Sequence, residues 1–180
     1  MDRLAAAAAV LLLALVAGCG GGGDVGTDAP TSISVTSSAF EEGEPIPAVH
    51  SCQGLDVSPP LAWSGVPTEA AALALVVHDL DSPGGPFFHW VVTDIDAGTI
   101  SVFEGGVPSG GVQAENSAGV ARYVGPCPPS GTHRYRFTIY ALSQRTGLSD
   151  GAPLNEALDA IGANVMSRGT LTGTFSAEPE

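Results

Sequence analysis

The sequence contains no lysine, and its six basic residues are all arginines, set against 19 acidic residues. The formal net charge at pH 7 is therefore −13. So acidic a chain is repelled by the phosphates of nucleic acid and by anionic membrane surfaces. We expect no nucleic-acid partner, and any contact with a membrane has to come from a separate anchor.

Long hydrophobic runs are also scarce, because only residues 4–17 form one. This run of Ala, Leu and Val is shorter than the roughly 20 residues that span a bilayer, so residues 1–18 are predicted to be a secretory signal peptide. Its end, Val16-Ala17-Gly18-Cys19, resembles a bacterial lipobox. Cys19 is then predicted to carry a lipid, and an ordinary signal peptide cleaved nearby is the alternative.

The segment after Cys19 begins with four glycines and stays polar, so residues 19–31 are predicted to be the lipidated cysteine and a flexible tether. Residues 32–176 have the size of one domain with its own core, and residues 177–180 form a tail. The expected location is the cell envelope, with the protein anchored by lipid on the extracytoplasmic side, at either the periplasmic or the extracellular face.

Cysteine is rare as well, and after Cys19 only Cys52 and Cys127 remain. In an exported domain a disulfide between them is the favoured interpretation. On the chain-entropy model, closing a loop of roughly 75 residues stabilises the fold by about 4 kcal/mol. Two separate buried thiols, or a soft metal site in which His50 joins the two cysteines, are the alternatives.

Glycine and proline are abundant and separate short segments rich in β-branched and aromatic residues, which is typical of an all-β core. One amphipathic helix is expected at residues 153–168, with Gly169 as its stop signal. The sequence therefore predicts a mostly-β sandwich with one late helix. Its clearest strands are expected at residues 33–37, 73–77, 88–95, 133–141 and 170–176.

Polar residues lie where two of these strands end or begin. Asp79 and Asp81 follow an apolar strand, and carboxylates at i and i+2 point the same way if they end a strand. Alternation along residues 133–141 puts His133 on the same face as Tyr135 and turns Arg134 to the other. Together these side chains predict a small anion-binding pocket. Turn-capping aspartates, a His133 satisfied by a backbone carbonyl and an Arg134–aspartate salt bridge are the structural alternatives.

Motifs for catalysis are missing. No nucleophile elbow, His-Glu-x-x-His pair, phosphate loop or dinucleotide fingerprint occurs in the sequence. We therefore expect no catalytic residue, no cofactor and no resident metal. The catalytic alternative is a divalent metal held by two acids and two histidines, which would hydrolyse a phosphoester.

Two supporting pieces, Ser58-Pro59-Pro60-Leu61-Ala62-Trp63 and Leu171-Thr172-Gly173-Thr174-Phe175, extend a family resemblance over roughly residues 33–176. The four main motifs of this resemblance lie between them. They are Asp79-Leu80-Asp81-Ser82-Pro83, Phe88-His89-Trp90-Val91-Val92, Tyr123-Val124-Gly125-Pro126-Cys127-Pro128-Pro129 and His133-Arg134-Tyr135. In this order they resemble the phosphatidylethanolamine-binding protein family, and within it the bacterial branch that is similar to Raf kinase inhibitor protein. One departure is Leu80, where the family usually has a proline between the two acids, and it affects the expected shape of that loop.

The resemblance implies a sandwich of two antiparallel sheets and a pocket for phosphate-like anions or phosphorylethanolamine-type head groups. It implies that the site is formed by Asp79, Asp81, His89 and His133, with Tyr135 nearby and Pro128 and Pro129 shaping one wall. Relatives that inhibit kinases or proteases make a protein-protein regulator the second implied function. The pKa values of the two histidines are expected near 6.5 or higher beside carboxylates, so anion affinity should weaken as the pH rises through them.

Overall fold

The computed structural model describes residue 25 and residues 28–176 of the chain. The predicted signal peptide, the lipidation site Cys19, most of the tether and the 177–180 tail lie outside these residues. Val25 packs beside the C-terminal helix, and Thr31 forms a bridge with Arg168, so contacts with the domain begin before Ser32. Within the described part, no helix has the length and the apolar character needed to cross a bilayer.

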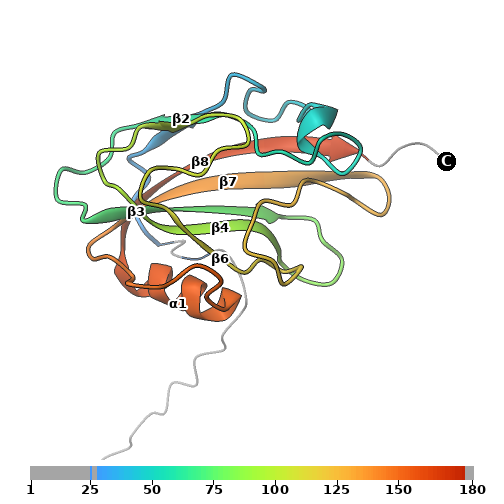
Figure 1. The fold of residues 1–180 in the computed structure, drawn as a ribbon. Coiled ribbons are helices and arrows are strands. Elements are labelled where there is room, and N and C mark those ends of the chain that lie inside the picture. The colour runs from blue at the N-terminus through green and yellow to red at the C-terminus, as the bar shows by residue number, and fades with distance from the viewer. Residues whose placement is uncertain (1–24, 26–27, 177–180) are drawn as a thin grey trace, which may run out of the picture.

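The described residues form two antiparallel sheets and one α-helix, which confirms the predicted fold class (Figure 1). The smaller sheet has the strand order β1-β2-β5, and the larger has the order β6-β4-β3-β7-β8. In chain order the elements are β1 (Ser34–Thr36), the 3-10 helix η1 (Ala48–His50), β2 (Leu61–Ser64), β3 (Ala72–Asp79), β4 (Phe87–Ile95), β5 (Ser101–Val102), β6 (Val112–Ala114), β7 (Thr132–Leu142), α1 (Leu154–Asn164) and β8 (Val165–Ser176).

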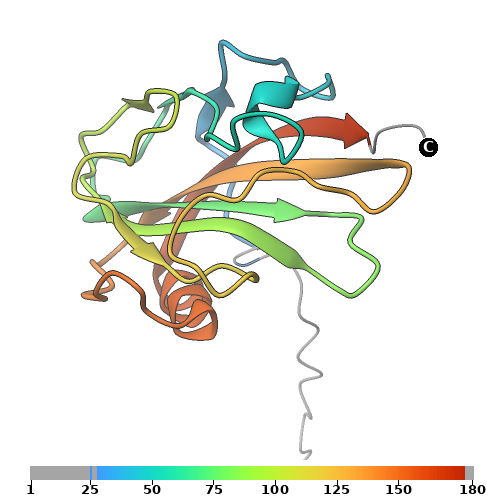
Figure 2. The same cartoon turned by 45° about the vertical axis from the view of Figure 1, so that its right-hand side comes forward.

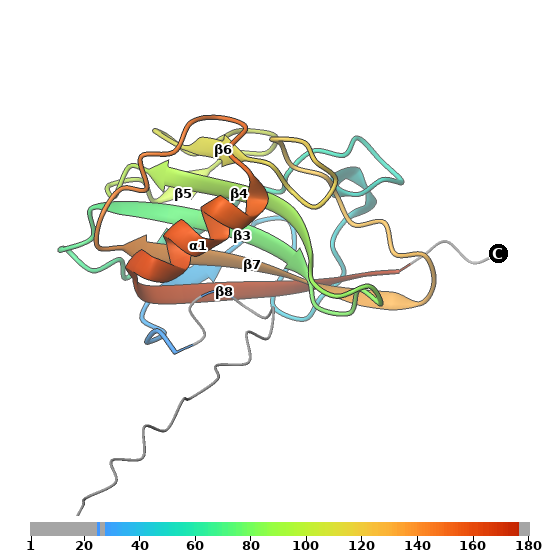
Figure 3. The same ribbon diagram turned by 90° about the horizontal axis from the view of Figure 1, so that it is seen from below.

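The larger sheet separates two cores. Its inner face packs against the smaller sheet, where Phe137 and Leu75 share one apolar cluster with Trp63. Its outer face is covered by α1, and there Tyr140 packs with Ile161. Figure 3 shows α1 lying across this outer face. Because both faces of the central strand β3 are covered, its residues are buried throughout, as its uninterrupted apolar sequence predicts.

The predicted C-terminal end of the helix is wrong. The observed helix α1 ends at Asn164, and β8 begins at once with Val165, so Arg168 and Gly169 lie in a strand. β8 pairs with the whole length of β7. This long ladder of backbone hydrogen bonds outweighs the apolar spacing that predicted one more helical turn. The predicted strand at residues 170–176 is therefore the second half of a longer one.

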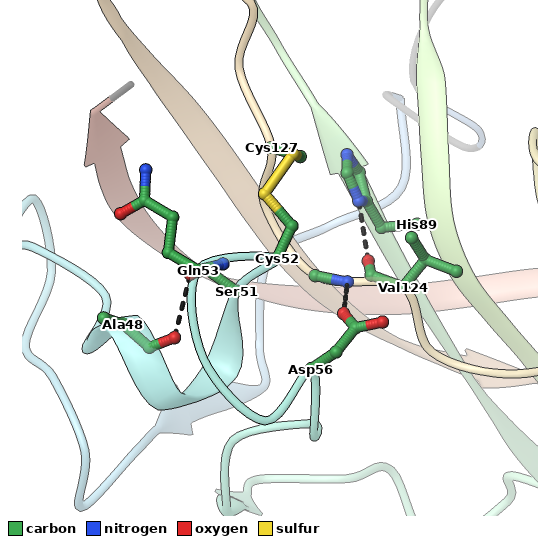
Figure 4. Close-up of a disulfide and its surroundings, with 9 residues drawn as sticks. Ala48, Ser51, Cys52, Gln53, Asp56, His89, Val124 and Cys127 are labelled. Carbon is green, nitrogen blue, oxygen red and sulfur yellow. Dashed lines mark hydrogen bonds between the residues drawn. A yellow bond between two sulfur atoms is a disulfide. The ribbon is translucent and has the colours of Figure 1, made fainter. Parts of the chain in front are cut away.

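The disulfide between Cys52 and Cys127 is present, with Cα atoms 5.5 Å apart, and this confirms the favoured pairing. It joins the turn after η1 to residues 122–127, the segment that we call the wall (Figure 4). Beside it, the Cys52 N–H donates a hydrogen bond to the Pro126 carbonyl over 3.1 Å. The free-thiol and thiolate-metal alternatives do not hold in this structure.

Candidate functional site

A cavity of about 280 Å³ lies at one end of the larger sheet, where β3 ends and β4 and β7 begin. Figure 2 shows the long loops that extend from this end, one between β3 and β4 and the other leading into β7. The cavity is lined by Asp79, Ser82, Pro83, Phe87, His89, Val124, Gly125, Cys127, Pro129, His133 and Tyr135. Four of the polar side chains predicted for the site therefore meet here, those of Asp79, His89, His133 and Tyr135.

Asp79 and His133 form a buried pair inside the cavity. The Oδ2 atom of Asp79 lies 2.7 Å from Nδ1 of His133, and both residues are less than 9% exposed. Because an ionised carboxylate can only accept hydrogen bonds, Nδ1 of His133 is the donor. The Nε2 atom of His133 is then the ring nitrogen that is left for a ligand.

Tyr135 lies between the two histidines. Its ring stands edge-on to His89 with centroids 5.2 Å apart and stacks against His133 at 6.4 Å. The residue is fully buried, and its hydroxyl makes no well-aligned hydrogen bond among the described residues. Burial raises the pKa of Tyr135, and the charge of Asp79 and a hydrogen-bonding interaction with its carboxylate add to this effect. The hydroxyl therefore keeps its proton, and the carboxylate of Asp79 is its poorly aligned acceptor.

His89 faces the cavity because β4 has a β-bulge. The ladder pairs Val77 of β3 with Trp90, but it pairs the next β3 residue with Phe88, so His89 has no partner. Plain alternation from Trp90, which faces the inner core, would turn His89 toward α1. The extra residue reverses this direction and puts the imidazole beside Tyr135. Bulges commonly re-aim a side chain next to a binding site.

A backbone carbonyl fixes the orientation of the His89 ring. Nδ1 of His89 lies 2.7 Å from the Val124 oxygen and donates to it, because a carbonyl can only accept (Figure 4). Burial lowers the pKa of His89, although the Val124 carbonyl and the charge of Asp79 act in the opposite direction. The expectation that nearby carboxylates raise the histidine pKa is therefore wrong for His89, because desolvation is the larger effect.

The wall that carries Val124 is held by a residue that sequence reasoning missed. Oδ1 of Asp56 accepts a hydrogen bond from the Gly125 N–H over 2.6 Å. The hydroxyl of Tyr123 donates to the His50 carbonyl over 2.9 Å. Gly125 has no space for a side chain, because an added Cβ would lie 2.4 Å from that same His50 oxygen. No motif marks Asp56, since its partner is a backbone group 69 residues away.

Asp81 does not line the cavity. It lies beyond the end of β3, where its own N–H binds Oδ1 of Asp79, and its carboxylate is turned to Arg134 on the surface. The bidentate contact with the guanidinium lowers the pKa of Asp81 to about 2. The two acids therefore do not point the same way, because the turn after β3 breaks the alternation, and the predicted Arg134 salt bridge is confirmed for Asp81.

Of the two remaining predicted residues, only Pro129 lines the cavity. Pro128 is buried and is not among the lining residues. The N–H of Leu80 donates to the Arg134 carbonyl over 2.9 Å, a bond that a proline at this position could not make. Over the described part of the chain, no cluster of three His, Cys, Asp or Glu side chains is arranged to hold a metal ion.

A family model described as phosphatidylethanolamine-binding protein matches residues 36–176. The chain belongs to this family. The match covers every strand of the larger sheet and all the residues that line the cavity. The resemblance inferred from the four motifs is therefore confirmed.

Among curated proteins the chain is 43% identical to "Putative lipoprotein LppC" of Mycobacterium tuberculosis over 178 residues, covering 88% of each chain. Among solved structures it is similar to the family homologue CT736 of Chlamydia trachomatis, with 37% identity, a TM-score of 0.76 and coverage of 82% of this chain and 99% of that one. It is also similar to the E. coli family member YbcL, with 29% identity, a TM-score of 0.77 and coverage of 82% and 100%. The two solved structures support the fold, and the relative LppC is named as a lipoprotein.

Proposed function

We propose that this protein is a lipid-anchored binding protein whose cavity takes phosphate-like anions or phosphorylethanolamine-type head groups. The observation that carries the proposal is the Tyr135 hydroxyl, a fully buried donor without a well-aligned acceptor in a cavity that also holds two histidines and one carboxylate. A buried polar group in a native protein normally has a partner, and here a ligand oxygen would supply it. A regulatory role would follow from occupancy of this cavity.

The two ends of phosphorylethanolamine suit different parts of the lining. The phosphate needs hydrogen-bond donors, which Tyr135 supplies and which a histidine ring of the lining supplies when it is protonated. The ammonium needs an acceptor with negative charge, and the Asp79 carboxylate is the one such group among the described lining residues. A cavity of about 280 Å³ is at the small end of ligand sites, which suits a head group rather than a whole lipid.

The proposed location rests on the N-terminal sequence and on the lipoprotein relative. Cys19 follows a signal-like apolar run, and the relative LppC carries the name lipoprotein. A disulfide in the folded part is consistent with an oxidising compartment outside the cytoplasm. The anchor would then hold the cavity near a membrane surface that displays head groups.

Calorimetric titration with phosphorylethanolamine at pH 6.5 tests the binding proposal. The wild-type protein should bind, and Asp79→Ala and His133→Ala should each abolish the measurable heat while thermal unfolding remains cooperative. Asp159→Ala is the matched control, because this acid is exposed on α1 and lies across the sheet from the cavity. It should bind as the wild type does.

Unchanged affinity in both cavity variants would refute the site assignment. Absence of binding by the wild type, with either phosphorylethanolamine or inorganic phosphate, would refute the function itself. Metal analysis of the same preparation adds a second check. Stoichiometric zinc or manganese together with turnover of a phosphoester would replace the binding proposal with the hydrolase alternative.

A further inference from the structure

The cavity offers an anion no permanent positive charge. None of the described residues that line it is an arginine, and Asp79 is their single carboxylate. Arg134 is turned to the surface, where Asp81 holds it. Arg122 lines a different cavity. A phosphate that enters must therefore find its hydrogen-bond donors among groups that are uncharged or that gain a proton.

Donors that are already in place are few. The Tyr135 hydroxyl is one, because it is buried, keeps its proton and has no well-aligned acceptor. The Gly125 N–H is not another, because Asp56 already accepts it. One hydroxyl cannot satisfy the several acceptor oxygens of a phosphate that has left water.

His89 presents a lone pair where a donor is needed. Its Nδ1–H is committed to the Val124 carbonyl, so in the neutral ring Nε2 is an acceptor. Burial holds the pKa of His89 below its ordinary value, so the ring is neutral near pH 7 in the empty cavity. A lone pair that faces a phosphate oxygen repels it. A proton between the two atoms replaces this repulsion with a charge-assisted hydrogen bond.

Other titratable groups face His89 from the elements packed against it. β3 contributes Asp79, whose charge raises the pKa of His89, and His78, whose charge lowers it. β7 contributes His133 and Tyr135, which line the same cavity. The wall contributes backbone carbonyls. A phosphate dianion within hydrogen-bond distance would bring more negative charge to Nε2 than Asp79 does, and an adjacent opposite charge favours the protonated ring.

We propose that the cavity takes up one proton when it binds a phosphate monoester, and that this proton lies between Nε2 of His89 and a phosphate oxygen. The inference rests on the proposed head-group function. The proton comes from the solvent and leaves with the ligand. Because one proton is bound for each ligand, the affinity for phosphorylethanolamine falls about tenfold for each pH unit above neutrality.

Titration calorimetry of the purified protein at pH 8 in two buffers, HEPES and Tris, tests the inference. At this pH a phosphate monoester is a dianion, so it brings no proton with it. The two buffers release protons with different enthalpies, so the difference in binding heat gives the number of protons taken up. The expected number is one for phosphorylethanolamine, and inorganic phosphate, which is mostly the hydrogen phosphate dianion at this pH, serves as a second probe of binding only.

Two variants locate the proton. His89→Gln should bind with no proton uptake, because an amide donates a hydrogen bond without titrating. Asp159→Asn is the control, because this acid is exposed on α1 across the sheet from the cavity, and it should still take up one proton. Thermal unfolding of both variants checks that they are folded, and the two-buffer result for the wild type does not depend on either of them.

The outcomes separate the inference from the function on which it rests. Phosphorylethanolamine binding by the wild type without proton uptake would overturn the inference and leave the head-group function in place. Uptake of one proton by His89→Gln would also overturn it, because the proton would then lie elsewhere. Failure of both phosphate probes to bind at any pH between 5.5 and 8 would overturn the function and the inference together.

Discussion

His133 and Asp79 are 54 residues apart in the sequence and meet across two neighbouring strands through a bond of 2.7 Å. Asp79 is paired with Tyr135 in the β3–β7 ladder, so His133 is its diagonal neighbour on the same face. The other oxygen of Asp79 accepts the N–H of Asp81. The sheet therefore fixes the imidazole of His133 before any ligand arrives.

Arg134→Ala should return the Asp81 carboxyl pKa from about 2 toward its ordinary value of 3.8. Because the pKa of Asp81 is lower in the folded state, its ionisation stabilises the protein above pH 3.8, and this stabilisation is lost as the pH falls toward 2. Between pH 3.8 and about 2, the free energy of unfolding of Arg134→Ala should fall less than that of the wild type. Near neutral pH the substitution should cost little stability, because the pair lies at the surface.

Carboxyl NMR titration of both proteins, with urea unfolding at pH 2.5 and 5, measures these effects. An Asp81 pKa that is the same in the wild type and in Arg134→Ala would contradict the assigned cause.

Asp56→Ala should weaken phosphorylethanolamine binding about tenfold, which corresponds to about 1.4 kcal/mol. The substitution leaves the Gly125 N–H without its acceptor and loosens the wall whose Val124 carbonyl orients His89. Asp56→Asn is the matched variant. It keeps an acceptor oxygen and tolerates the positive φ of 56° at this position, so its affinity should stay within about threefold of the wild type.

Calorimetry gives the two affinities, and nitrogen NMR of the imidazole reports the His89 tautomer. If Asp56→Ala binds as tightly as the wild type, or if Asp56→Asn is as weak as Asp56→Ala, Asp56 does not position the wall through this hydrogen bond.

Replacing Cys52 and Cys127 together by serine should lower the free energy of unfolding by about 3 to 4 kcal/mol, because the disulfide closes a loop with a sequence separation of 75. The affinity of the cavity should change much less. Asp56 and the Cys52 N–H still hold the wall in the folded protein. Urea unfolding and calorimetry of the same double variant separate the two effects. A stability loss below 1 kcal/mol, or a complete loss of binding by a folded variant, would argue against this division of roles.

Cys19→Ser should release the protein from the membrane fraction when it is expressed in a bacterial host that processes lipoproteins. The thiol of Cys19 is the proposed point of lipid attachment, and a serine hydroxyl cannot replace it. Mass spectrometry of the mature wild type should show a lipid-modified N-terminal cysteine. Recovery of unmodified wild type in the soluble fraction would instead support the ordinary signal peptide.

The sequence was sufficient to predict the parts of the site that depend on strand alternation. Residues 133–141 alternate cleanly, so the inward direction of His133 and the outward direction of Arg134 follow from parity alone. His89 was predicted for the pocket from its histidine chemistry and from the family resemblance, although parity would have turned it away. Its direction depends on a bulge, and a bulge is decided by the pairing of β4 with β3, which local sequence does not reveal.

Two further differences have the same origin in tertiary structure. Asp81 was expected beside Asp79, but the turn after β3 and the guanidinium of Arg134 hold it outside the cavity. Residues 165–168 were expected to be helical, but they complete the ladder between β7 and β8. In both cases a partner distant in the sequence decides the conformation, and local propensity is too weak to oppose it.

The central claim is that the cavity at the end of the larger sheet binds a phosphate head group. A crystal structure of the protein grown with phosphorylethanolamine tests it most directly. The account predicts a phosphate within hydrogen-bond distance of the Tyr135 hydroxyl and of Nε2 of His89, with the ammonium near the Asp79 carboxylate. A ligand bound elsewhere on the protein, or a cavity that holds only water at saturating ligand, would contradict the claim.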